Sequence, residues 1–262
     1  MAKFNYSWDE RKISKYIKEG RGSGEYEEYK PWLTVRDVPS KGRVTRLKGV
    51  KINRVHHVLS DLERSALVLF EWSNRILDIR EQYPILERDK MQEISEMLGF
   101  KHPRYPNSSV NTVFTTDFLL TVRNDDGTIC TVARTIKPSS QLVDQNTINK
   151  LLIEKEFYKL SGINWAIITE KELPKMLTNN LYELRNSFEL ISEDESMIED
   201  VFKALVSEDR HKRIIDSIDN ISKSYNIPHA KVINIFHFLV YNKKINFDLS
   251  KKINLNKVWE EV

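Results

Sequence analysis

An aspartate and a lysine on two neighbouring segments have the types and spacing to act on a phosphate. Asp117 lies in "NTVFTTDFLLTV", where alternation predicts a strand with Phe114 and Phe118 on one face and Asp117 and Leu119 on the other. Lys137 ends the following segment, "ICTVARTIK", which stops at a proline. A carboxylate and an ammonium at one end of two paired strands could bind a cation and a scissile phosphate together.

The turn between the two segments predicts which of their residues face each other. Asp126-Gly127 is typical of a hairpin turn. If the hairpin closes there, partners have numbers that sum to about 252, which places Thr135 opposite Asp117 at about 5 Å and Lys137 one diagonal step away at about 7 to 8 Å. The side chain of Ile136 then points to the core, and its carbonyl faces the same site as Asp117.

Oxygen atoms in this arrangement suit Mg²⁺, which keeps several waters and can acidify a water that attacks a phosphate. Asp117 is the expected ligand, and Lys137 could orient the water or offset the charge that grows on the phosphate. The hairpin alone leaves an alternative open. Asp117 and Lys137 could form a surface ion pair worth less than about 1 kcal/mol, with no catalytic role.

Glu63 and the adjacent pair His56-His57 are further candidates. Ser60 is expected to cap a helix, and Ser60-Asp61-Leu62-Glu63 has the spacing of a capping box, in which Glu63 only bonds the Ser60 amide. The two histidines follow each other on an extended segment, so their side chains face apart. That geometry argues against shared metal ligation.

The order of expected elements over residues 60–170 predicts a compact α/β unit. A helix follows Ser60, a strand covers 75–86, a polar helix covers 88–98, the hairpin comes next, and a helix over 144–160 ends at Gly162. "INWAIITE" is expected to be a buried strand that completes the unit.

Beyond residue 170 the pattern changes to helices. Pro228 is expected to start a helix that Asn226 caps, with apolar residues at helical spacing. The last segment, "KINFDLSKKINL", alternates around a polar turn and predicts a small hairpin. We therefore expect two domains, residues 1–170 and residues 171–262, the second of them helical and winged-helix-like.

The charge is unevenly distributed along the chain. The formal net charge is +3, yet residues 1–59 carry 14 Lys or Arg and 7 Asp or Glu. A basic N-terminal arm of this kind suits contact with a polyanion such as DNA, although a solvated basic surface has the same composition.

The remaining composition excludes several classes of protein. Cys130 is the single cysteine, so an internal disulfide and a Cys-cluster zinc site are excluded. No apolar run is long enough to cross a bilayer, and the N-terminus has no apolar signal-peptide core. We expect no membrane association and a cytoplasmic location.

Several short segments, in order and at their spacings, resemble the TnsA family, the endonuclease subunits of bacterial heteromeric transposases. They are "IKEGRG", "YKPWLTVRDVPS", "GRVTR", "RVHHVLSDLE", "LDIREQYPIL", "TTDFLL" and "IKP". The resemblance covers roughly residues 1–170 and is weaker over the C-terminal part. It implies a restriction-endonuclease-like N-terminal domain and a winged-helix-like C-terminal domain.

The resemblance also implies an active site. Glu63 and Asp117 match the family's metal-binding acids, and Lys137 matches the lysine of its Gln-x-Lys strand motif. Thr135 stands where the family has glutamine, so one metal contact changes, while the carbonyl of Ile136 remains a ligand. A threonine hydroxyl reaches less far than a glutamine side chain, so we expect the site to need a higher metal concentration for activity. Glu154, on the helix after the motif, is a supporting carboxylate or a solvated surface residue.

The implied activity is Mg²⁺-dependent hydrolysis of DNA near the 5′ ends of a transposon, with Mn²⁺ able to substitute. The implied partners are double-stranded DNA at the transposon ends, a TnsB-like transposase and a TnsC-like ATPase that docks on the C-terminal domain. Two alternatives stay open. One is a nuclease of the same fold that works alone, and the other is a non-catalytic assembly subunit that bridges DNA and an ATPase.

Overall fold

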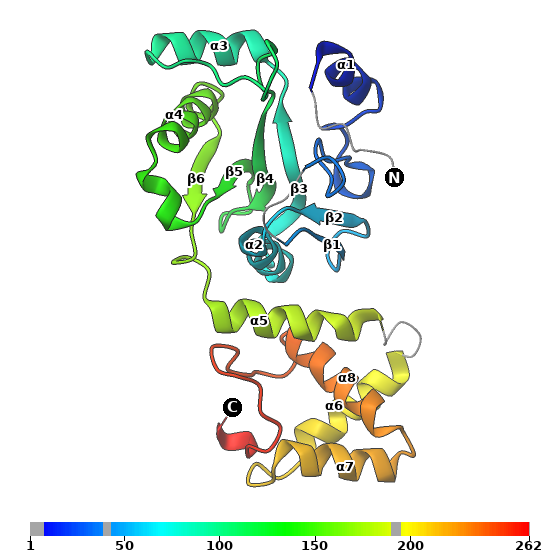
Figure 1. Ribbon diagram of the computed structural model, residues 1–262. Helices are drawn as coiled ribbons and strands as arrows, with labels where there is room; N and C mark the ends of the chain where they lie inside the picture. The colour runs from blue at the N-terminus through cyan, green and yellow to red at the C-terminus, as the bar shows by residue number, and fades with distance from the viewer. Residues whose placement is uncertain (1–7, 39–42, 190–194, 262) are drawn as a thin grey trace. The chain divides into compact units, whose positions relative to one another are not determined.

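The structure is a computed structural model that describes residues 8–38, 43–189 and 195–261 of the 262-residue chain (Figure 1). The chain divides into two compact units, residues 1–173 and residues 174–262, which are described separately. Across the described ranges, every helix is too short or too polar to cross a membrane.

A four-stranded sheet forms the centre of the first unit. Its order is β3 (Ile76–Ile85), β4 (Phe114–Arg123), β5 (Ile129–Ile136) and β6 (Asn164–Ile168). The first three strands are antiparallel, and β6 runs parallel to β5. The pairs between β4 and β5 run from Phe118 with Arg134 to Arg123 with Ile129, so the predicted hairpin register is confirmed over these residues.

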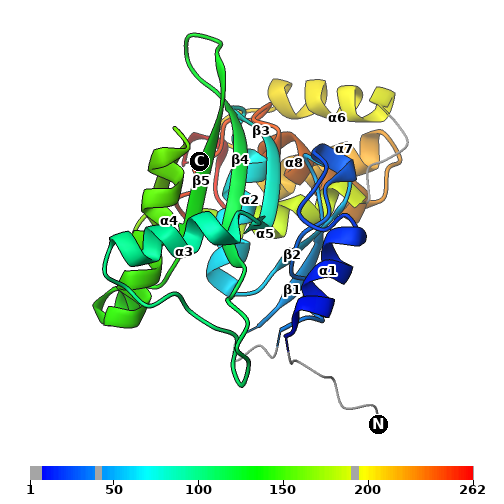
Figure 2. The same cartoon turned by 90° about the horizontal axis from the view of Figure 1, so that it is seen from above.

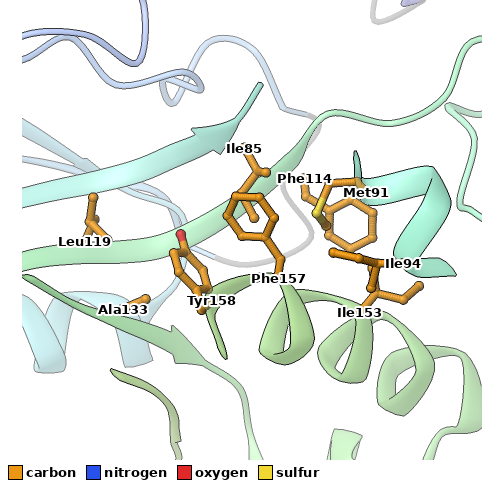
Figure 3. Close-up of a cluster of buried hydrophobic side chains, with 9 residues drawn as sticks. All are labelled: Ile85, Met91, Ile94, Phe114, Leu119, Ala133, Ile153, Phe157 and Tyr158. Atoms are coloured by element: carbon orange, nitrogen blue, oxygen red, sulfur yellow. The ribbon is translucent and has the colours of Figure 1, made fainter. Parts of the chain in front are cut away.

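Helices cover both faces of this sheet (Figure 2). On one face lies α2 (Asp61–Trp72), where the ring of Phe70 meets Phe118 at 5.2 Å between centroids. On the other face lie α3 (Arg88–Met97) and α4 (Gln145–Leu160). Figure 3 shows the apolar cluster that they close against the strands. Its members are Ile85, Met91, Ile94, Phe114, Leu119, Ala133, Ile153, Phe157 and Tyr158.

The strict alternation predicted for β4 is wrong at Asp117. Phe114 and Leu119 belong to the same apolar cluster beside α4, whereas Phe118 packs against α2. Residues five positions apart on one face require an interruption of the two-residue period between them. On the neighbouring strand, Gln82 has a φ of 50°, and no ladder pair joins it to Asp117. The sheet is therefore distorted at the height of Asp117.

The strand "INWAIITE" is not buried as predicted. The part of it that forms a strand, β6, lies at the edge of the sheet beside β5, and the side chains of β6 are exposed or half-buried. An edge strand has a neighbour on one side alone, so its apolar residues lose less contact with water than those of β4. Apolar composition did not distinguish an edge strand from a central one.

The described parts of the basic N-terminal region fold onto the sheet rather than forming a separate arm. This region contains α1 (Glu10–Lys18) and a two-stranded antiparallel ribbon, β1 (Thr45–Lys48) with β2 (Val55–Val58). Trp8, Tyr16, Trp32 and Tyr105 form a buried aromatic cluster that anchors α1.

The glycine of "EGRG" at position 22 marks a close approach to β3. Gly22 has a φ of 80°, and a Cβ added there would lie 2.2 Å from Cγ of Pro84. Any side chain would therefore be strained in its backbone and would collide with the proline ring. This glycine lets the N-terminal segment lie directly against the sheet.

A buried ion cluster joins the ribbon to β3. Both Glu81 carboxylate oxygens accept hydrogen bonds from Arg54, at 2.8 and 2.5 Å, and His56 Nδ1 lies 2.9 Å from the same carboxylate. Glu81 and His56 are fully buried. Burial alone would raise the pKa of Glu81, but the bonds from Arg54 and His56 outweigh it and lower that pKa to about 2. His56 is thus a structural partner of a carboxylate.

The second unit is helical. Its helices are α5 (Lys175–Leu184), α6 (Glu195–Ser207), α7 (Ile214–Ser224) and α8 (His229–Tyr241). The apolar positions expected for the last helix are buried along α8. The N-cap of α8 is Pro228 rather than Asn226, which has a φ of 52° in the turn after α7.

The small hairpin predicted after α8 is not formed. Residues 244–255 contain turns and bends but no strand. Asn180 of α5 donates its side-chain amide to the carbonyls of Leu249 and Lys251, at 2.9 and 2.7 Å. A side chain thus satisfies backbone groups that a partner strand would satisfy in a hairpin. The wing of a winged helix is missing from the part of this unit that the structure describes.

The Glu81 cluster predicts acid sensitivity. Because its folded pKa lies below the ordinary 4.5, Glu81 contributes stability that is present above about pH 4.5 and is lost as the pH falls towards 2. We expect Glu81→Gln to lower the free energy of unfolding by roughly 3 to 5 kcal/mol at pH 7, and by much less at pH 3. Urea unfolding at both pH values measures this.

Glu156→Gln is the matched control for Glu81→Gln. Glu156 pairs with Lys159 at 3.0 Å on the surface of α4, where the lysine side chain is 69% exposed. Its loss should cost less than about 1 kcal/mol at either pH. Equal losses for the two variants would contradict a stabilising role for the buried cluster.

Candidate active site

The structure brings Asp117 and Lys137 together at the end of the β4–β5 hairpin. The Asp117 carboxylate accepts a hydrogen bond of 2.6 Å from the amide of Ile136 and one of 3.0 Å from Lys137 Nζ. Lys137 Nζ also donates to the carbonyl of Ile136 at 2.9 Å. The side chains are 11% exposed for Asp117 and 30% for Lys137, so this is a half-buried pair rather than a fully solvated one.

Lys137 carries a positive charge in this setting. Burial works to lower its pKa, but the neighbouring carboxylate of Asp117 outweighs burial and raises the pKa of Lys137 above its ordinary value. An ammonium can donate hydrogen bonds to a water or a phosphate oxygen, but it cannot accept a proton. Lys137 is therefore suited to orientation and charge compensation.

Glu63 lies in the first turn of α2, where three donors hold its carboxylate. Leu59 N donates at 2.8 Å, Ser60 Oγ at 2.9 Å and Gln82 Nε2 at 3.0 Å. The predicted N-cap is confirmed, because Ser60 Oγ accepts from the Glu63 amide at 3.1 Å. The return contact differs from the predicted capping box, since the Leu59 amide takes the place expected for the Ser60 amide.

Capping does not account for the whole environment of Glu63. Burial, and then the negative charge of Asp117, raise the pKa of Glu63 to about 7. The Asp117 carboxylate therefore lies close enough to Glu63 to act on it electrostatically. A cation placed between them would relieve their repulsion.

Gln82 is a site residue that the sequence did not indicate. Its side chain orients Glu63, and its carbonyl accepts a hydrogen bond from the Trp32 amide at 3.2 Å. It occupies the left-handed region of backbone space, where glutamine is uncommon. No local pattern within "REQYP" predicts that conformation, and the bonding partners of Gln82, Trp32 and Glu63, lie outside that stretch.

The Thr135 hydroxyl bonds to Glu154 and not to the Asp117 carboxylate, although Thr135 lines the same cavity as Lys137. Its hydroxyl donates to Glu154 Oε1 at 2.7 Å and accepts from Trp165 Nε1 at 3.1 Å, on the side of α4. The hydroxyl of Thr116 donates to the same Glu154 oxygen at 2.7 Å. Asp117 instead bonds to the amide of Ile136. The two side chains thus have different hydrogen-bond partners.

Glu154 is buried at 5% exposure, so the predicted alternative of a solvated surface residue is wrong. Burial raises the pKa of Glu154 to about 7, despite the hydrogen bonds from Thr116 and Thr135. Its carboxylate reaches the site from the helix that follows the hairpin. The threonine hydroxyls fix its position.

A cavity of about 270 Å³ opens beside Lys137. It lies between the hairpin, the segment before β4, and the start of α4. Two ammonium groups and one buried carboxylate contribute to its wall, so it can receive a negatively charged group near Lys137. Its polar lining includes Thr112, Thr115, Thr135, Lys137, Gln141, Thr147, Lys150 and Glu154.

The available donors fit a hard divalent cation. Asp117 Oδ2 and the Ile136 carbonyl oxygen both converge on one positive charge, the ammonium of Lys137. Glu63 adds a second carboxylate. Nowhere in the described ranges do three or more acidic, histidine or cysteine side chains gather as a metal cluster. The set matches Mg²⁺, which is usually held by one or two carboxylates with waters and substrate phosphates.

Comparison with known proteins points to one family. A family model described as "TnsA-like endonuclease N terminal" matches residues 73–170, which contain Asp117, Thr135 and Lys137. Transposon Tn7 transposition protein TnsA from Escherichia coli is 36% identical over 263 residues, covering 98% of this chain and 93% of that protein.

The hydroxyl network around Glu154 predicts the effect of Thr135→Val. This change removes one donor to Glu154 and the acceptor of Trp165 Nε1 while keeping the side-chain shape. We expect it to lower the free energy of unfolding by about 1 to 3 kcal/mol, and its effect to be non-additive with that of Thr116→Val. Denaturant unfolding of the two single variants and the double variant measures both effects.

Thr131→Val is the control on the same strand, because Thr131 is half-buried and lies outside the network. If Thr135→Val costs no more stability than Thr131→Val, the hydroxyl network does not stabilise the fold.

Proposed function

This chain belongs to the TnsA family, and on that basis we propose that it is the Mg²⁺-dependent endonuclease subunit of a cut-and-paste transposase. Its reaction is hydrolysis of a DNA phosphodiester near the 5′ ends of the transposon. One observation carries the proposal. Asp117, the Ile136 carbonyl and Lys137 meet at the end of the β4–β5 hairpin, within the region that the endonuclease family model matches.

In this proposal Asp117, Glu63 and the Ile136 carbonyl hold the metal. When bound, Mg²⁺ supplies a Lewis acid for the phosphate and lowers the pKa of a bound water. Ser60, the Leu59 amide and Gln82 keep the Glu63 carboxylate in a fixed orientation. Such fixed groups need no reorganisation when charge develops on the phosphate.

Lys137 remains protonated and donates hydrogen bonds to the attacking water or to a phosphate oxygen. Its raised pKa supports this role over that of a general base. Lys150, on the wall of the same cavity, adds positive charge where the DNA backbone would enter.

We assign Thr135 and Glu154 a supporting role. Thr135 anchors Glu154 rather than acting as a metal ligand, which is consistent with the direction of its hydroxyl. Glu154 then presents a carboxylate near Lys137 from α4. The observation behind this role is that Glu154 helps to raise the pKa of Lys137.

The proposed partners are those of a transposase assembly. They are double-stranded DNA at transposon ends, a TnsB-like transposase that cuts the 3′ ends, and a TnsC-like ATPase. The first unit, close to residues 1–170, carries the nuclease, and the helical region over 171–262 docks the ATPase. Such an assembly acts on cellular DNA and works in the cytoplasm. The likeness to a transposition protein along nearly the whole chain supports these assignments.

The nuclease role predicts the effect of Asp117→Ala and Lys137→Ala. Each change removes a group that the reacting phosphate needs, so we expect 5′-strand cleavage to fall at least about 100-fold. The measurement uses end-labelled transposon-end DNA, Mg²⁺ and the TnsB-like partner. Asp125→Ala is the control, because its side chain is 88% exposed at the tip of the same hairpin.

Full cleavage by Asp117→Ala would contradict the proposal. Cleavage by neither the native chain nor its variants, beside an active TnsB-like partner, would favour a non-catalytic assembly subunit. Cleavage that needs no partner would favour a nuclease that works alone.

Metal removal gives a separate prediction. We expect chelation to abolish cleavage, and Mg²⁺ or Mn²⁺ to restore it. Because a ligand that binds only the folded state stabilises it, Mg²⁺ should also raise the melting temperature of the native chain, and raise it less for Asp117→Ala. Thermal unfolding with and without Mg²⁺ measures this. Equal shifts for the two proteins would place metal binding elsewhere.

A further inference from the structure

The segment that forms the β1–β2 ribbon has one sign of charge. Residues 38–60 contain six Lys or Arg and no Asp or Glu. Two of these cations serve the fold. Arg54 pairs with Glu81 inside the protein, and Lys51 donates to the carbonyl of Ser73 at 2.6 Å. Arg43, Arg46 and Lys48 are exposed.

The two faces of the ribbon differ in burial. Leu47, His56 and Val58 face the interior. On the opposite face, Arg46 pairs with His57 across the ribbon, and Lys48 pairs with Val55, whose side chain is 48% exposed. Arg46 and Lys48 are exposed. The outward face of the ribbon is therefore basic and accessible to water.

Two further exposed arginines lie close to the ribbon in the chain. Arg43 is exposed just before β1, and Arg36 is exposed in the segment that reaches the ribbon through the bond of 3.4 Å from Val35 N to His57 Nδ1. Within the residues that the structure describes, neither Arg43 nor Arg46 has a carboxylate partner. Arg21 and Arg88, by contrast, are paired with Asp37 and Glu10. The unpaired positive charges of Arg43 and Arg46 suit contact with a polyanion.

The ribbon ends at the candidate active site. Leu59, the residue directly after β2, holds the Glu63 carboxylate through its amide. A strand rises about 3.3 Å per residue, so Arg46, opposite His57, lies only about 7 Å along the ribbon from Leu59. Figures 1 and 2 both show β1 and β2 beside α2, which carries Glu63.

We propose that the outward face of the β1–β2 ribbon, with Arg46 and Lys48, binds the phosphate backbone of the DNA duplex next to the cleaved bond, together with the nearby exposed Arg36 and Arg43. This inference rests on the proposed function and adds a second contact surface to it. The contact is electrostatic and independent of sequence, since arginine and lysine on a ribbon face reach phosphates without reading bases. The phosphates of a duplex form a regular row of negative charges that is complementary to this basic face.

The test is the salt dependence of DNA binding by the full chain. Fluorescence anisotropy with a labelled duplex of arbitrary sequence, in the absence of divalent cations, gives the dissociation constant over a series of salt concentrations. Each lost phosphate contact lowers the slope of log K against log salt by about 0.9. The double variant Arg43→Ala/Arg46→Ala should therefore lose about two units of slope.

The control removes the same charge elsewhere. Lys155→Ala/Lys159→Ala changes two exposed lysines on α4, away from the ribbon, and should leave the slope unchanged. Equal slopes for the two double variants would overturn the inference and favour an acidic protein surface as the occupant. Native binding that does not depend on salt would also overturn it.

The two experiments distinguish failure of the proposed function from failure of this inference. If the native chain shows the expected slopes but never cleaves transposon-end DNA, the nuclease assignment is wrong and the ribbon contact stands. If it cleaves DNA but both double variants bind alike, the ribbon contact is wrong and the nuclease assignment stands.

Discussion

The bond from the Ile136 amide to the Asp117 carboxylate decides how the candidate site is built. Ladder pairing between β4 and β5 stops at Phe118 and Arg134, and beyond that point a side chain takes the role of a backbone acceptor. The carboxylate is thereby fixed at the end of the hairpin. Lys137 then follows directly on the chain and compensates the charge. The edge strand β6 holds the same residues from the other side, because Ile136 pairs with Ile168 and the Lys137 amide donates to the Ile168 carbonyl at 3.1 Å.

The neighbouring strand β3 supports the site from the other side through two adjacent residues. Glu81 is neutralised by Arg54 and also bonds to His56, and these contacts tie the ribbon to the sheet. Gln82 turns its side chain to Glu63 and its carbonyl to Trp32. One short stretch of backbone therefore holds both the N-terminal region and one acidic residue of the site. The left-handed conformation of Gln82 is the strain that accompanies this arrangement.

Features that depend on nearby residues could be predicted from the sequence. The cap at Ser60 and the register of the hairpin are of this kind, because a turn or a helix start is determined within a few positions. The break of alternation at Asp117 could not be predicted, since Gln82 on another strand accompanies it. Apolar pattern likewise did not show that β6 lies at an edge.

The C-terminal unit shows the same limit. Alternation over 244–255 favoured a hairpin, but Asn180, about 70 positions away in the chain, provides the hydrogen bonds instead. The burial of Glu154 depends on two threonines from different strands. The polar residues of α4 gave no sign that this one faces inward. In both cases the structure depends on partners that are distant in the sequence, so a short stretch of sequence could not predict it.

The position of Arg54 and His56 ahead of Glu81 has a consequence for synthesis of the chain. A ribosome adds roughly 5 to 20 residues per second, so the basic ribbon has left the exit tunnel seconds before β3 follows it. Arg54 and His56, the partners of Glu81, are therefore already outside the ribosome when that carboxylate emerges. A fragment limited to residues 73–170 would contain the whole four-stranded sheet but would lack Arg54 and His56. Glu81 would then have no partner from the ribbon to offset the cost of its burial. The nuclease fold is in this sense inseparable from the segment that precedes it.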